Sequence, residues 1–374
     1  MASSPPSQKK SSEPSVSFSS FETSAAIIER TRSKIAKPIH WKSLDEDGAR
    51  SFIKVPPQRD KRKNLGNNRF RLLYVVVDCP DMSQLYKQES LLQTAADYGW
   101  TNERFRFFIK NNTAGSAVIE STESISFIAQ TPRDDNYPFF SFSISDKCLE
   151  GHQRNPDWVC LFFAGSDTDL DVVESVLCRD PFPNDYVAPL SPDFMILPVA
   201  LLRWQVDQIT AGLTALKDKI REQDEVLLKN MNFKTARTNM FQFKSIRMNF
   251  FQMRQMHWML HRRWSFAQEF AGNLTKCFDR IEKRNSDDGP VAYSAILRDT
   301  VQSQEAILGT LLNDLDSTPL RMDTQQTMLD NQTSIMIAKN SDMAAEEARR
   351  DSASMRTLAV VALIFLPGTF VAVR

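Results

Sequence analysis

Four acidic side chains stand close together in the middle of the chain, directly after an apolar run. They are Asp167, Asp169, Asp171 and Glu174. Carboxylate oxygens are the ligands that hard divalent cations such as Mg²⁺ prefer, although the spacing lacks the glycine of an EF-hand loop. The alternative is a solvated helix start, where the helix dipole favours acidic residues. The sequence therefore predicts a helix start here, with a weak regulatory metal site as the functional alternative.

A histidine pair, His257 and His261, is separated by one helical turn and could also ligate a metal. No glutamate accompanies the pair in an HExxH arrangement, which favours a core or partly buried pair over a metal site. The chain has only 4 histidines and 11 glycines, and it contains no Walker-type loop, GxGxxG or GxSxG motif. We therefore expect neither an enzyme nor a bound cofactor.

The overall charge is balanced, with 46 basic and 46 acidic residues, so no nucleic-acid partner is expected. The local charge is not balanced. Residues 229–284 hold 12 basic and 3 acidic side chains, whereas residues 150–193 hold 9 acidic and 2 basic ones. These two blocks could face each other or line separate surfaces. The 5 cysteines are scattered without CxxC spacing, which indicates buried thiols rather than a disulfide framework or zinc site.

The first half of the chain predicts a tail followed by a mixed α/β head. Residues 1–65 are rich in Ser and Pro and carry a basic run, which predicts a disordered tail. The head is expected over residues 69–198. Helices are expected at 82–98 and 167–178. Strands are expected where β-branched and aromatic residues run together, at 70–77, 105–110, 124–130, 139–145 and 158–164.

The second half is helical in character. Apolar residues recur at alternating spacings of 3 and 4 over residues 202–220 and again over 246–281. This heptad pattern is typical of long helices that pack side by side, and it predicts an antiparallel helical bundle over residues 199–318. Breaks are expected at 287–290 and at Ser317-Thr318-Pro319. A polar stalk helix is expected over residues 321–356.

The last apolar segment, residues 357–373, carries no charge. At ~1.5 Å per residue it is just long enough to cross a ~30 Å hydrocarbon core. Arg349, Arg350 and Arg356 precede it, and positive charge marks the cytoplasmic side of a membrane helix. The alternative is a buried terminal helix. The predicted fold class is thus an α+β cytosolic head, then long helices and a stalk that runs into one C-terminal transmembrane helix.

Residues 353–372 resemble the first transmembrane helix of the CorA-type magnesium transport family and are most similar to its fungal CorA-like members. The core of the match is Ile-Phe-Leu-Pro-Gly-Thr-Phe at residues 364–370. The resemblance implies a pentameric homo-oligomer in lipid, with head and N-terminus in the cytosol and magnesium as the transported or sensed ion. With Pro367 as anchor, it implies that these positions line the pore: Met355, Leu358, Ala362, Leu366 and Thr369.

In that family a Gly-Met-Asn filter and a second membrane helix follow, and the same alignment places the filter just after Arg374, where the sequence stops. If the chain is truncated in this way, within its first transmembrane region, we expect impaired magnesium transport. Hydrophobic rings cannot replace the oxygen ligands that recognise Mg²⁺. The alternative is a non-transporting helical scaffold, tethered to a membrane or soluble in the cytoplasm, which binds itself or related subunits through its heptad surfaces.

Overall fold

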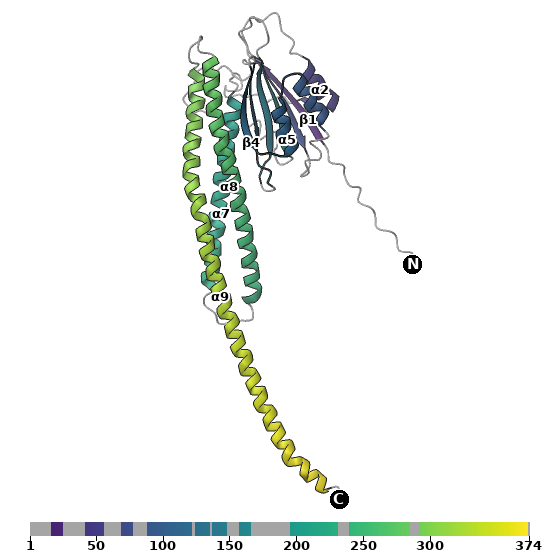
Figure 1. The fold of residues 1–374 in the computed structure, drawn as a ribbon, viewed down its shortest axis with the longest axis vertical. Coiled ribbons are helices and arrows are strands. Elements are labelled where there is room, and N and C mark those ends of the chain that lie inside the picture. Colours follow the sequence, from purple (N-terminus) through teal and green to yellow (C-terminus); the bar gives the residue numbers. More distant parts are fainter. Residues whose placement is uncertain are drawn as a thin grey trace, which may run out of the picture. The chain divides into compact units, whose positions relative to one another are not determined.

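The computed structural model describes residues 16–24, 42–55, 69–77, 88–121, 124–134, 137–147, 157–165, 195–230, 239–284 and 292–372. The chain divides into two compact units. The sheet unit comprises Met1–Gly212 and Met259–Asn313, and the bundle unit comprises Leu213–Trp258 and Asp314–Arg374. Three long helices contribute residues to both units: α7 (Ile196–Asn230), α8 (Asn239–Arg284) and α9 (Ala292–Ala372) (Figure 1).

Among the described residues, seven strands form one mixed sheet in the order β2-β1-β3-β7-β6-β5-β4. The two central strands, β3 and β7, are parallel, and Leu73 lies opposite Leu161. All other neighbours are antiparallel. The central strands are nearly continuous apolar runs because both faces of the sheet are covered. The strands are β1 (Val16–Ser24), β2 (Lys42–Leu44), β3 (Arg69–Val77), β4 (Gly115–Glu120), β5 (Ile125–Gln130), β6 (Phe140–Lys147) and β7 (Asp157–Gly165).

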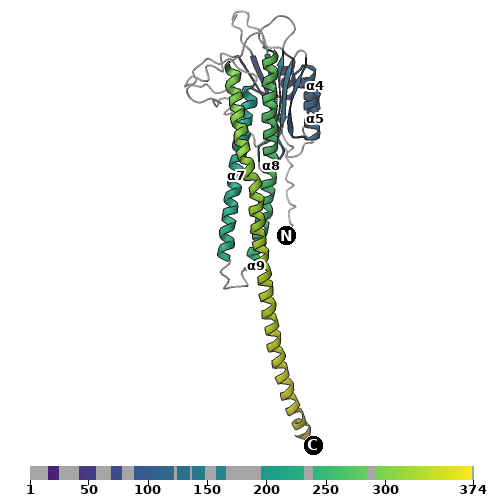
Figure 2. The ribbon, with the colours of Figure 1, turned by 60° about the vertical axis from the view of Figure 1, so that its left-hand side comes forward.

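Three short helices cover one face of the sheet: α2 (Glu46–Lys54), α4 (Glu89–Asp97) and α5 (Glu103–Asn111). Figure 2 shows α4 and α5 next to each other against the strands. Their apolar sides join Leu73, Leu161 and Phe163 of the central strands in one buried cluster. Arg71 of β3 ties α2 to this face, since it donates a hydrogen bond to the Phe52 carbonyl.

An aromatic ladder crosses the opposite face of the sheet. It consists of one ring from each of four adjacent strands, Tyr74, Phe162, Phe142 and Phe127, with successive centroids 5.5, 6.1 and 6.1 Å apart. Phe270 of α8 contacts the last two rings, and Trp204 of α7 stacks on Phe140. Large buried rings dominate core energetics, so this face fixes where α7 and α8 pack within the sheet unit.

Helix α8 also covers the backbone of the edge strand β4. The Glu269 Oε1 atom accepts a hydrogen bond from the Ser116 N–H at 3.1 Å, and Asn273 donates to the Ser116 carbonyl at 3.0 Å. Further along the helix, Arg280 donates to the Val118 carbonyl at 3.3 Å. An open edge strand is a template for pairing with other chains. These side chains therefore occupy groups that another strand would otherwise use.

Four of the five predicted strands are confirmed, as β3, β5, β6 and β7, but the strand predicted at residues 105–110 is wrong. This segment lies in α5. Asn102 begins the helix by accepting a hydrogen bond from the Phe105 N–H at 3.0 Å, and Asn112 ends it in a left-handed conformation. Phe105, Phe108 and Ile109 are buried at helical spacing, while the intervening Phe107 is 57% exposed.

The disordered tail predicted for residues 1–65 is also wrong for the parts of it that the structure describes. β1 pairs with β3 along its length, and residues 42–55 form β2 and α2. Ala49 and Ile53 of α2 are buried in the core, which explains why a segment of low apolar content folds. The helix predicted at 82–98 is present as α4 from Glu89, whereas the helix predicted at 167–178 lies outside the described residues.

In the bundle unit, α9 runs parallel to α7 and antiparallel to α8. The direction follows from pairs spaced seven residues apart along each helix: Lys217–Asp314, Asp224–Arg321, Arg254–Asp323 and Arg247–Asp330. From Leu315 to Met336, every seventh residue of α9 is apolar and buried, namely Leu315, Met322, Leu329 and Met336. On α7 and α8 the predicted seam residues Leu216, Ile220, Phe250 and Met253 are buried too, in agreement with the heptad prediction.

The break predicted at Ser317-Thr318-Pro319 is wrong, because α9 continues without interruption from Ala292 to Ala372. The hydroxyl groups of Ser317 and Thr318 donate to the Asp314 carbonyl at 3.0 and 2.7 Å, so both side chains support the helix locally. Within the described part of the chain, no helix contains a stretch both long and apolar enough to span a membrane.

Candidate functional site

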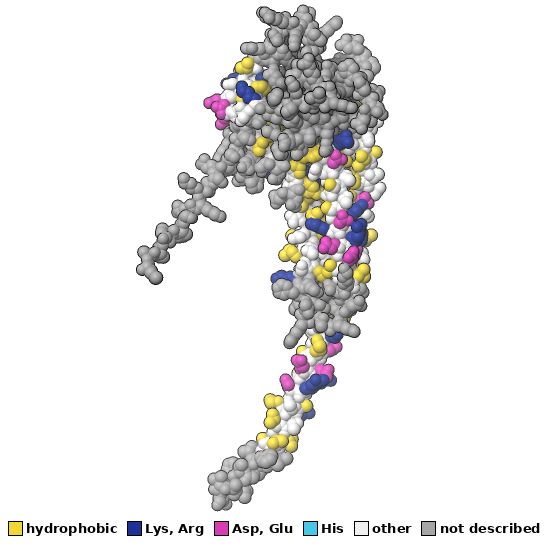
Figure 3. Space-filling view, turned by 180° about the vertical axis from the view of Figure 1, so that it is seen from behind, with side chains coloured by type: hydrophobic (Ala, Val, Ile, Leu, Met, Phe, Trp, Pro, Cys, Tyr) yellow, Lys and Arg dark blue, Asp and Glu magenta, His cyan; other side chains and the backbone are white. Residues whose placement is uncertain are grey.

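The part of α9 beyond Met336 is the candidate functional site. Every side chain from residue 337 to residue 363 is exposed. The exposed side chains include large apolar ones, with Met355 at 70% and Leu363 at 75%. Figure 3 shows charged side chains first and hydrophobic ones after them along this part of the helix. An apolar surface of this kind is typical of a site that packs against lipid or a further molecule.

The helix gives the predicted pore-lining residues one shared face. Met355, Leu358 and Ala362 are spaced by 3 and 4 residues, which places them on one side of α9, and all three are exposed. Leu366 and Thr369 continue the spacing within the same helix, but their side chains lie outside the described part of the structure. The backbone is therefore compatible with a single line of five side chains.

Charged side chains precede the apolar stretch. Arg350 pairs with Glu346 one turn earlier, with 2.6 Å between nitrogen and oxygen, and both side chains are mostly exposed. An exposed pair of this type stabilises a helix by only ~0.3–0.5 kcal/mol. Asp342 and Glu347 are also exposed. This segment is therefore an accessible, mixed-charge surface.

Of the two predicted metal sites, the structure describes the histidine pair but not the acidic cluster. The acidic residues Asp167, Asp169, Asp171 and Glu174 lie outside the described residues. Within the described ranges, no group of three or more His, Cys, Asp or Glu side chains is placed to hold a metal ion. His257 Nε2 lies 2.9 Å from the Leu315 carbonyl oxygen, and the His261 ring lies 5.9 Å from Trp264. His257 is half-buried, in agreement with the sequence interpretation, whereas His261 is exposed, so the prediction of a buried pair is wrong for His261.

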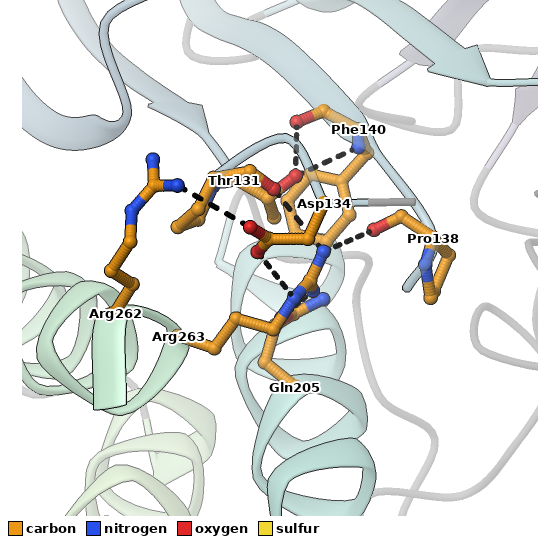
Figure 4. A network of polar contacts seen from close by, with 8 residues as sticks. Thr131, Asp134, Pro138, Phe140, Gln205, Arg262 and Arg263 are labelled. Carbon is orange, nitrogen blue, oxygen red and sulfur yellow. Dashed lines mark hydrogen bonds and ion pairs between the residues drawn. The ribbon is translucent and has the colours of Figure 1, made fainter. Parts of the chain in front are cut away.

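The sheet unit contains a buried cation that the sequence did not predict. Arg263 of α8 is fully buried and forms an ion pair with Asp134, with Nε 3.3 Å from Oδ2 (Figure 4). Its guanidinium donates hydrogen bonds to Gln205 Oε1 at 3.2 Å and to the carbonyls of Pro132 and Pro138 at 3.1 and 3.3 Å. It also lies over the Tyr137 ring, 4.5 Å from its centroid.

A glycine allows this arrangement. A Cβ atom at Gly212 of α7 would lie 2.4 Å from the Tyr137 hydroxyl oxygen and 2.7 Å from Leu260 Cδ2. Real Cβ atoms essentially never approach so closely, so any larger residue at position 212 would force the Tyr137 and Leu260 side chains to shift. Arg263 is one of 12 basic residues in a 56-residue block, and no spacing distinguished it from the others. Its role follows only from the fold.

Burial shifts the pKa values of several groups in the sheet unit. Desolvation lowers the pKa of Arg263 to about 10, although Asp134 partly opposes the shift. Desolvation also raises the pKa of Tyr137. On β6, burial raises the pKa of Asp146 to about 6, and Arg284 opposes this shift. Asp146 Oδ1 accepts no hydrogen bond from the residues that the structure describes.

Comparisons with known proteins do not assign the chain to a family. No protein-family model matches the chain, and no curated protein is similar to it. Among solved structures, the soluble domain of CorA from Methanocaldococcus jannaschii is similar at 13% sequence identity with a TM-score of 0.35. The match covers 74% of this chain and 92% of that one. Similarity at this level does not establish a function.

Proposed function

We propose that the chain is a subunit of a CorA-like divalent metal ion transporter, with magnesium as the ion, and that the end of α9 is its membrane helix. The observation that carries this proposal is the continuity of α9. The helix leaves the bundle after Met336 and runs unbroken to Ala372, with its apolar side chains exposed from Met355 to Leu363. Such a surface requires lipid or further subunits to cover it.

The sequence of the segment supports the same proposal. Residues 364–370 carry the motif that resembles the first membrane helix of the CorA-type family. A ring formed by Met355 and Leu358 from several subunits could close a pore by excluding water. The arginines before the segment favour a cytosolic sheet unit and N-terminus. The proposed partners are membrane lipid and further copies of the same chain.

Membrane insertion is tested by alkaline carbonate extraction of membranes from cells that express the chain. We expect the chain to remain in the pellet. A Val360→Arg, Leu363→Arg variant is expected in the supernatant, because each cation near the centre of a membrane helix costs ~2.5–3.5 kcal/mol. Release of the unchanged chain by carbonate would contradict the proposal.

The pore face is tested by oxidative cross-linking of single cysteines in membranes. Leu358→Cys is expected to form disulfide-linked dimers of the chain, because the face that lines a pore approaches its own copies. Val360→Cys is the matched control, since residues 358 and 360 are similarly exposed, at 67% and 58%, but lie on opposite sides of α9. Equal cross-linking at both positions would argue against a pore face, and the unchanged chain gives the background from native cysteines.

Transport itself is tested with the chain reconstituted in vesicles that contain a Mg²⁺-sensitive dye. The proposal expects impaired but measurable Mg²⁺ uptake, above that of protein-free vesicles, and loss of this uptake in Leu358→Arg, which places charge on the pore face. Membrane insertion without any uptake would instead support the non-transporting scaffold.

A further inference from the structure

Pro319 lies in the interior of α9, within the bundle unit. Proline has no backbone N–H, so it cannot donate the helical hydrogen bond to the carbonyl four residues earlier. That carbonyl belongs to Leu315. A proline in a helix interior costs about 3 kcal/mol and normally kinks or ends the helix. The sequence therefore predicted a break here, and the continuity of α9 requires a local cause.

The Leu315 carbonyl has a replacement donor. His257 of α8 places its Nε2 atom 2.9 Å from this oxygen. A carbonyl oxygen can only accept, so Nε2 carries the hydrogen in this contact. The imidazole thus donates to the one carbonyl that Pro319 deprives of its backbone donor. Leu315 itself is fully buried, so water has poor access to replace the missing hydrogen bond.

Neighbouring contacts hold α8 and α9 in the register that this hydrogen bond requires. Arg254 and Asp323 form an ion pair with 2.5 Å between nitrogen and oxygen, and Arg247 and Asp330 form another at 3.1 Å one heptad further along. These pairs recur with the heptad period and are largely exposed. The contact between His257 and Leu315 does not recur in this way. It replaces a backbone hydrogen bond that is missing only at Pro319 within this part of α9.

We propose that His257 is a positioning residue that carries α9 through Pro319 as one continuous helix. Its ring supplies across the helix interface the hydrogen bond that the α9 backbone cannot supply to itself. The inference concerns the bundle unit, and it holds whether or not the chain transports an ion.

A double-mutant cycle tests the proposal in the full chain. Alanine at residue 319 restores the backbone N–H, so His257→Ala is expected to matter only while Pro319 is present. We expect His257→Ala to accelerate hydrogen exchange of the amides at residues 316–318 and 320–323 about tenfold, the factor for loss of one buried hydrogen bond. In the Pro319→Ala background the same substitution should change exchange by less than about twofold.

Two further variants separate the hydrogen bond from packing. His257→Gln keeps an amide donor at similar reach and is expected to restore slow exchange at the same backbone amides. His261→Ala, one turn along α8, is the matched control and should leave this exchange unchanged. Equal acceleration by His257→Ala with and without Pro319 would mean that the ring acts by packing alone and would overturn the proposal. Unchanged exchange in His257→Ala would overturn it as well.

Discussion

Both units contain arginine–aspartate pairs, but the two kinds of pair differ in their surroundings. In the sheet unit the side chains of Arg263 and Asp134 are 0% and 2% exposed. In the bundle unit those of Arg254 and Asp323 are 51% and 62% exposed. The buried guanidinium requires three further hydrogen-bond acceptors and an aromatic ring, whereas the exposed one has water. Burying a charge thus commits many groups to one geometry, while an exposed pair commits only its two members.

The largest expected effect is at the buried pair. Arg263→Ala should destabilise the protein by ~3–5 kcal/mol, because the buried Asp134 keeps only its contact with the half-exposed Arg262 and several acceptors lose their donor. Urea unfolding followed by circular dichroism measures this loss. Arg262→Ala is the control, since Arg262 contacts the same carboxylate at 3.3 Å but is 38% exposed. Equal losses for the two variants would remove the distinction between buried and exposed cations.

Asp146 is an intermediate case, a largely buried carboxyl whose Oδ1 accepts no hydrogen bond from the described part of the chain. Its pKa rises from an ordinary 3.8 to about 6 in the folded protein. Between these pH values the folded state holds a proton that the unfolded state has released, so stability falls as the pH rises from 4 to 6. Asp146→Asn should remove this loss.

We therefore expect Asp146→Asn to match the unchanged protein near pH 4 and to be more stable at pH 7 by on the order of 2 kcal/mol. Urea unfolding at a series of pH values measures the difference. If the variant is instead less stable at pH 7, the Asp146 carboxylate has favourable partners. Asp146 would then be a compensated buried charge, as Arg263 is.

The next prediction concerns the polar side chains of α8 that form hydrogen bonds with the backbone of strand β4. A Glu269→Ala, Asn273→Ala variant should lose ~1–2 kcal/mol of stability and should self-associate more, because the edge strand is opened. Size-exclusion chromatography with light scattering measures the association. Gln268→Ala, on an exposed neighbouring position of α8, should do neither. Destabilisation without association would mean that the contacts matter only for packing.

The smallest effect is expected in the bundle unit. Arg254→Ala should cost less than about 1 kcal/mol, and this cost should shrink further in 1 M salt, because the pair with Asp323 is exposed. Thermal unfolding at low and high salt measures both quantities. A loss as large as that of Arg263→Ala would break the comparison between the two units.

The sequence predicted the parts of the fold that depend on repeated local patterns. Continuous apolar runs identified β3 and β7, and heptad spacing identified the buried faces of α7 and α8. The sequence prediction failed where a few individual residues determine the local structure. In α5 the caps Asn102 and Asn112 override a strand-like composition. At Pro319 the deciding group is His257, far away in the sequence.

The candidate site was predictable only in part. The spacing of Met355, Leu358 and Ala362 gave their shared face, because an unbroken helix makes spacing equivalent to direction. The burial of Arg263 was not predictable, since its acceptors come from the loop between β5 and β6 and from α7. Only the folded chain brings these groups to one point, and no local pattern in the sequence marks them.

The exposed part of α9 also determines where a protease would cleave the chain. Helical turns without tertiary cover open more readily than those in a packed core, and the bonds after Lys339, Arg349, Arg350 and Arg356 are all substrates for trypsin. Among the bonds within the described residues, cleavage of an uncovered chain would thus begin beyond Met336, before the sheet and the bundle are cut. The order in which these bonds become resistant would map what covers the helix, turn by turn.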